Sequence, residues 1–136
     1  MPELPESLAA LVADLEDMGF ETEREEWHPW PGGGDMQLRR PRTRGVKRVR
    51  MMQDRGPWDL EVQIGRGWYE PYTALLALDE RPHQQRALSH AERHAVTIKL
   101  VQRFTGSRTQ RRAIKDRAKQ LSLVYTRWAE GEVPPK

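Results

Sequence analysis

The sequence contains no cysteine, which excludes disulfide scaffolds, thiolate zinc sites and thiol catalysis. It also lacks any apolar run close to the roughly 20 residues that a membrane-spanning helix needs. The N-terminal segment is acidic and lacks the basic region of a secretory signal. We therefore expect a cytoplasmic protein that has no membrane partner and no cofactor. The arginine-rich, cysteine-free composition would suit a bacterial or phage protein.

Apolar residues are also scarce, at 37% of the 136 residues, whereas charged residues reach 32%. Such a chain is polar for a globular protein. Five tryptophans and three tyrosines nevertheless supply the aromatic groups that disordered chains lack. The length favours a single domain over residues 1–136, with one modest core.

Charge is sorted along the chain. Residues 1–34 carry nine acids and one base, residues 35–57 carry eight bases and two acids, and residues 101–136 carry nine bases and three acids. The net charge of +3 therefore hides two strongly positive segments. Segments of this kind attract polyanions or acidic protein surfaces.

Periodicity of apolar residues predicts the secondary structure. It indicates helices over residues 5–18, 89–104 and 109–129, and strands over residues 20–27, 36–40, 46–52, 58–64 and 72–78. Ser89 and Glu92 have the spacing of a capping box. We expect an α+β fold in which a small antiparallel sheet of four to five strands has one N-terminal helix and two C-terminal helices. The chain then divides into an acidic N-terminal third, a basic hairpin over 36–52 and a helical pair over 89–129.

The basic hairpin is the first candidate binding element. Its seven bases are Arg39, Arg40, Arg42, Arg44, Lys47, Arg48 and Arg50. Guanidinium groups bind phosphate oxygens in a bidentate manner, so such a hairpin could lie along a nucleic-acid backbone. Alternatively, the glutamates of strand 20–27 pair with these arginines across the sheet. In that case the C-terminal segment provides the only free positive surface.

The last helix is the second candidate. Its basic stripe spans a sector of roughly 100° on the helical wheel, and consists of Arg108, Arg111, Arg112, Lys115 and Lys119. The stripe contains no acid, which favours binding over an ordinary solvated face. Arg117 falls on the apolar side, where we expect it to snorkel or to pair with an acid.

Aromatic residues lie near several predicted turns: Trp27, Trp30, Trp58, Trp68 and Tyr69. Aromatic side chains between basic ones can stack on unpaired bases of nucleic acid. Capping of a small core is the interpretation that we favour for these five.

Catalytic patterns are weak. His90 and His94 lie one helical turn apart, but no third ligand follows, so we expect no metal site. Asp35 with Glu61 and Gln63 resembles the Asp…Glu-x-Lys arrangement of restriction-type nucleases, in which two carboxylates hold Mg²⁺. Here glutamine stands where those enzymes have lysine.

These patterns lead to three functional hypotheses. The first is a small non-enzymatic accessory or regulatory protein that binds DNA or RNA through the basic hairpin and the basic helix face. The second is a protein inhibitor of the immunity, antitoxin or anti-defence type, which blocks a partner enzyme through a charged surface. The third is a divergent metal-dependent nuclease.

Overall fold

The computed structural model describes residues 4–28, 33–53, 57–84 and 86–129. It contains one five-stranded antiparallel sheet in which every strand pairs with its neighbours in sequence, in the order β1-β2-β3-β4-β5. The strands are β1 (Glu21–Trp27), β2 (Gly34–Arg39), β3 (Arg48–Gln53), β4 (Asp59–Ile64) and β5 (Gly67–Tyr69). Predicted turns at residues 27–35 and 53–57 extend outside the described residues, as does Trp30.

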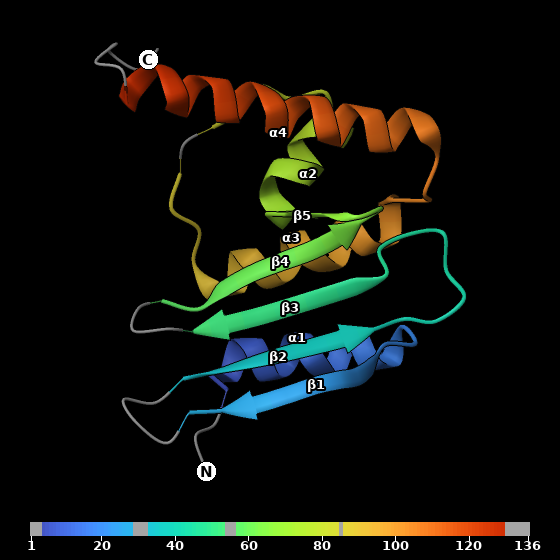
Figure 1. Cartoon of the computed structure of the whole chain (residues 1–136). Helices are drawn as coiled ribbons and strands as arrows, with labels where there is room; N and C mark the ends of the chain where they lie inside the picture. The colour runs from blue at the N-terminus through green and yellow to red at the C-terminus, as the bar shows by residue number, and fades with distance from the viewer. Residues whose placement is uncertain (1–3, 29–32, 54–56, 85, 130–136) are drawn as a thin grey trace.

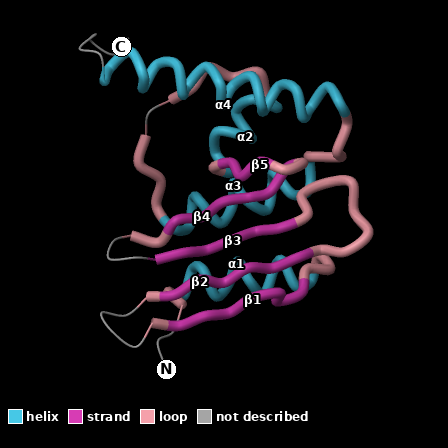
Figure 2. Tube along the Cα trace, in the orientation of Figure 1, coloured by secondary structure: helices cyan, strands magenta, loops and turns pink. Residues whose placement is uncertain are grey.

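The helices are α1 (Glu6–Asp17), α2 (Pro71–Leu78), α3 (His90–Arg103) and α4 (Arg108–Ala129). Figure 1 shows α1 and α3 behind one face of the sheet, while α2 and α4 lie beyond its β5 edge. Figure 2 shows no described helix crossing the front face of the sheet. The predicted α+β class and antiparallel sheet are confirmed. None of the described helices is long and apolar enough to cross a bilayer.

Our prediction of a strand over residues 72–78 is wrong, because this segment forms α2. Almost every residue of α2 is apolar and buried, so its sequence shows no period that could separate a helix from a buried strand. Pro71 occupies the first helical turn, where its missing N–H costs nothing. The fifth strand is instead Gly67–Tyr69, and three helices rather than two follow the sheet.

The core lies between the sheet and the helices behind it. The predicted apolar stripe of α1 is confirmed by buried Leu11 and Leu15, which belong to one cluster with Val49 and Val62 of the sheet. Burying each such side chain contributes roughly 1.5–3 kcal/mol. Ile114 of α4 is fully buried in the same cluster. Ile114 therefore joins α4 to the core, and α4 packs against α2.

Polar caps fix where α3 and α4 begin. The predicted capping box is present, since Ser89 Oγ accepts from the Glu92 N–H at 3.1 Å and Glu92 Oε1 accepts from the Ser89 N–H at 3.2 Å. At α4, Ser107 Oγ accepts from the Gln110 N–H at 3.1 Å, and the Gln110 side chain reaches back to the Thr105 N–H at 2.8 Å. These bonds set the starting position of the basic stripe.

The two edges of the sheet differ. β5 has three residues. β1, at the other edge, has seven residues of which the first six are exposed, and four of these are glutamates. A bulge between Thr22 and Arg24 interrupts its pairing with β2.

Candidate functional site

The front face of the sheet, which no described helix crosses, is called its open face (Figure 2). Ion pairs on this face decide which arginines of the basic hairpin are available to bind a ligand. Arg48 Nε donates to Glu23 Oε2 at 2.9 Å, and Arg48 Nη1 donates to Gln63 Oε1 at 2.9 Å. Gln37 Nε2 donates to the same Glu23 oxygen at 2.8 Å. The hydrogen bond from Arg48, followed by that from Gln37, lowers the pKa of Glu23 from 4.5 to about 2. Arg48 is thus an internal partner of β1.

Arg50 and Arg40 are engaged as well. Arg50 Nη2 donates to Glu61 Oε1 at 2.6 Å, and its guanidinium lies 4.6 Å from the centre of the Trp68 ring. The Arg40 guanidinium lies 5.0 Å from the Phe20 ring centre and donates to the Val46 carbonyl at 3.3 Å. Burial lowers the pKa of Arg40. These contacts hold the sheet and the β2–β3 loop together.

The remaining predicted binding residues are all exposed. They are Arg39, Arg42, Arg44, Lys47, Arg108, Arg111, Arg112, Lys115 and Lys119. The alternative in which acidic β1 neutralises the hairpin therefore applies to Arg48, while the basic loop itself stays exposed.

The β2–β3 loop packs against the junction of α3 and α4. Val46 in this loop is fully buried, which anchors the loop to the core. A Cβ on Gly45 would lie 2.8 Å from the Phe104 carbonyl oxygen. Gly106 has φ +85°, and a Cβ there would overlap the Arg44 carbonyl. The two basic segments thus adjoin, at the right of Figure 1.

A groove of about 820 Å³ lies between α4 and the β4–β5 turn. Its basic lining consists of Arg66, Arg108, Arg111, Arg112 and Lys115, and we call it the cationic groove. Ile64 and Tyr69 also line it. Ile64 is buried and Tyr69 is half-buried, whereas all five bases are exposed. The apolar side chains therefore form the floor and the bases form the rim.

The arginines on the rim interact unfavourably with the dipole of their own helix, α4. Arg108, Arg111 and Arg112 lie at the N-terminal end of α4, whose first turn contains no acid. Positive charge at a helix N-terminus is unfavourable because the macrodipole is already positive there. This placement costs helix stability and raises the positive potential of the cationic groove.

The cationic groove and the predicted stripe share most of their bases but do not coincide. Lys119 is exposed but does not line the cationic groove. An acid that lies outside the five-base stripe, Asp116, does line it. Arg117, which we expected to snorkel or to pair with an acid, forms no ion pair among the described residues; its Nη2 donates to the Arg81 carbonyl at 2.5 Å.

Arg66 is the basic residue that sequence analysis missed. It lies at the tip of the Gly65–Gly67 segment between β4 and β5, to which we had assigned no binding role. The sequence shows that residue 66 is basic, but it does not show that this residue lies beside α4. That position depends on the β4–β5 hairpin, whose pairing begins at Ile64↔Gly67.

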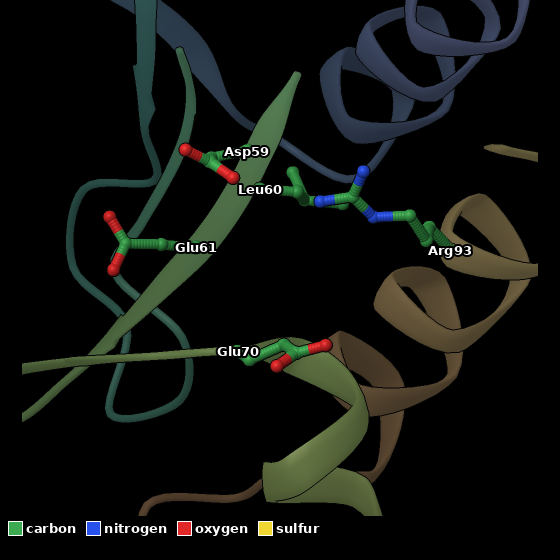
Figure 3. A pocket seen from close by; sticks show the side chains of 5 residues that line it. All are labelled: Asp59, Leu60, Glu61, Glu70 and Arg93. Atoms are coloured by element: carbon green, nitrogen blue, oxygen red, sulfur yellow. The ribbon is translucent and has the colours of Figure 1, made fainter. Parts of the chain in front are cut away.

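A second hollow, of about 330 Å³, lies beside β4 and contains part of the nuclease-like pattern (Figure 3). The Asp59 and Glu61 side chains extend away from Arg93, and Arg50 already engages Glu61. Asp35 lies on β2, separated from β4 by β3, and its Oδ2 is 3.8 Å from Arg24. The arrangement does not bring Asp35 and Glu61 together around a common ion.

The histidine pair is divided between two environments. His94 Nε2 lies 2.6 Å from Asp14 Oδ2, linking α3 to α1, while His90 is exposed at the start of α3. Among the described residues, no three His, Asp or Glu side chains are grouped so that they could hold a metal ion.

The aromatic residues also have different roles. Trp58 is buried in the core, and its ring centre lies 6.2 Å from that of Trp27 in an edge-to-face arrangement, as the core-capping interpretation predicts. Trp68 lies on the open face of the sheet, where Arg50 covers one side of its ring. Tyr69 lines the cationic groove.

Comparison of the chain with known protein families, curated proteins and solved structures finds no significant match.

Proposed function

We propose that this protein is a non-enzymatic nucleic-acid-binding accessory or regulatory protein, and that its cationic groove binds the phosphate backbone. One observation carries the proposal: bases from the β4–β5 turn and from α4 converge on a single groove together with one acid. Arginine and lysine contacts to phosphates supply most sequence-independent affinity for nucleic acid. The exposed bases of the adjoining β2–β3 loop extend the positive surface beyond the groove.

The proposal changes the predicted interface. Arg40, Arg48 and Arg50 support the fold, whereas Arg39, Arg42, Arg44 and Lys47 remain candidates for phosphate contacts. In the proposed interface, Arg66 joins Arg108, Arg111, Arg112 and Lys115 at the centre of the surface.

The test measures oligonucleotide affinity by fluorescence anisotropy. Arg111→Glu reverses a charge in the cationic groove, and Lys99→Glu makes the same change on an exposed residue of α3. We expect R111E to weaken binding at least tenfold and K99E to leave affinity within about twofold of the wild type. For a single strand, log K should fall with log salt by about 0.7 per phosphate contact, or about 3.5 if all five bases contact phosphates.

Two results would overturn the proposal. One is the absence of binding to any oligonucleotide at about 50 mM salt and micromolar protein. The other is cleavage of DNA or RNA with Mg²⁺ or Mn²⁺ that Glu61→Ala removes, because this would establish the nuclease hypothesis.

A second candidate function, inhibition of an enzyme with a basic surface, is favoured by the acidic end of the molecule. Glu16, Asp17 and Glu21 are exposed at the β1 end of the sheet, opposite the β5 end that carries the cationic groove. Such a surface would speed association with a basic partner. A partner enzyme that forms a one-to-one complex with R111E but no longer binds E16K/D17K would favour this function.

A further inference from the structure

We infer that the cationic groove takes a single strand of nucleic acid and that Tyr69 is the platform on which one of its bases stacks. This inference rests on the proposed function and names the class of nucleic acid that the groove recognises.

The contrast between rim and floor supports a single strand. A duplex exposes phosphates on a convex surface and keeps its bases stacked inside, so a buried apolar floor would gain little from it. A single strand exposes both phosphates and base faces. Proteins that bind single strands combine a positive groove with aromatic stacking platforms, and this groove provides both in Arg66, the α4 bases and Tyr69.

The backbone of β5 holds the Tyr69 ring in position. A Cβ on Gly67 would lie 2.8 Å from Tyr69 Oη and 2.9 Å from its Cζ and Cε2, so the ring lies across a residue that has no side chain. Tyr69 also packs against the core. A ring held in this way loses little conformational freedom when a base stacks on it, which favours affinity.

The volume of the groove agrees with a short segment of one strand. About 820 Å³ falls within the roughly 300–1,000 Å³ of sites for small ligands. A few nucleotides therefore fill the groove, and the strand would continue over the basic β2–β3 loop, whose Arg44 carbonyl meets Gly106 just before α4.

The adjacent aromatic residue provides a matched control. Trp68 precedes Tyr69 on β5 but pairs with Gln63 on the open face, beside Arg50. Neighbouring residues of a strand point to opposite faces, so Trp68 lies outside the cationic groove.

The experiment compares one sequence as single-stranded DNA, single-stranded RNA and duplex DNA by fluorescence anisotropy at about 50 mM salt. We expect at least a tenfold preference for the single strands over the duplex. Tyr69→Leu should weaken single-strand binding by about 5- to 150-fold, the loss expected for one base stack. Tyr69→Phe and Trp68→Leu should each stay within about twofold of the wild type. The DNA and RNA arms show which strand is preferred.

The outcomes separate this inference from the proposed function. Equal affinity for duplex and single strands, unchanged by Y69L while R111E abolishes it, overturns the inference and leaves the proposed function in place. No binding to any oligonucleotide overturns both. If Y69L does not fold, Gly67→Ala replaces it, since the new Cβ displaces the ring and leaves the tyrosine present. G67A that binds single strands as the wild type does would overturn the inference.

Discussion

Arg48 and Arg111 show how the same type of residue receives different roles from its neighbours. Arg48 on β3 donates hydrogen bonds to Glu23 of β1 and to Gln63 of β4, so its charge is used within the fold. Arg111 is exposed on the rim of the cationic groove. The local partners of each arginine therefore decide whether it can contact a ligand.

Glu23→Gln should destabilise the protein in a pH-dependent manner. The folded-state pKa of Glu23 is lowered to about 2, so its carboxylate contributes stability above the ordinary pKa of 4.5, and this contribution is lost as pH falls from 4.5 towards 2. At pH 7 we expect E23Q to lose about 1 kcal/mol or less, because the pair is partly exposed. Urea denaturation at pH 7, 4 and 2.5 should show this difference shrinking with acidity. Glu21→Gln, on the same strand, is the control. A difference in stability between E23Q and the wild type that does not change with pH would contradict the lowered pKa of Glu23.

Gly106→Ala should be more harmful than Gly65→Ala. Both glycines have positive φ, at +85° and +62°, so an alanine at either position costs about 1–2 kcal/mol in backbone strain. A Cβ at Gly65 meets nothing within 4 Å, whereas one at Gly106 overlaps the Arg44 carbonyl. Thermal denaturation should place G106A well below G65A. Equal melting temperatures would mean that the β2–β3 loop does not pack against the α3–α4 junction.

At the scale of elements, sequence periodicity was informative wherever one face of an element meets solvent. α1 and β4 show clear periods because one side of each is polar, and both lie where predicted. α2 is apolar on nearly all sides, so the same method assigned it to a strand. Burial on every side removes the pattern on which such predictions depend.

The candidate site was predictable only in part, because its bases come from elements whose contact depends on tertiary structure. The α4 stripe followed from helical spacing within one segment. The participation of Arg66, and the pairing that withdraws Arg48 and Arg50, depend on which strands are neighbours and on their register. Hydrophobic periodicity in one sequence does not encode these cross-strand distances.

Asp116→Asn should strengthen nucleic-acid binding through α4. Asp116 lines the cationic groove, where its negative charge repels phosphate. Removal of one exposed charge is worth up to about 1 kcal/mol, so we expect affinity to rise about two- to fivefold at 50 mM salt. The gain should disappear near 300 mM salt through screening. Asp17→Asn on α1 controls for the change in net charge. Weaker oligonucleotide binding by D116N than by the wild type would show instead that Asp116 helps to position the basic residues of the rim.

At the scale of the whole molecule, the acidic and basic surfaces lie at opposite ends of the sheet. α1 and β1 carry exposed acids, and α4 with the β4–β5 turn forms the cationic groove. Charges separated by more than the screening length of about 8 Å at 0.15 M salt have little influence on each other. The two ends should therefore act as independent surfaces.

The triple variant E16Q/D17N/E21Q should keep its oligonucleotide affinity within about twofold of the wild type at 0.15 M salt. Effects of distant sites are generally additive and uncoupled, and these acids do not line the cationic groove. Anisotropy titrations of the triple variant and of R111E compare the contributions of the two surfaces to oligonucleotide affinity. A change of tenfold or more would show that the acidic end contributes to nucleic-acid binding.

The glutamate-rich β1 also affects how copies of this protein behave at high concentration. An edge strand exposes unpaired N–H and C=O groups that can template aggregation. If two β1 edges approached each other in antiparallel register, their exposed glutamates would come close together, and like charges directly opposite are destabilising. The other edge, β5, offers only three residues for such pairing. The strand order thus places the glutamate-rich strand at the longer exposed edge, where repulsion between like charges opposes edge-to-edge pairing of two copies.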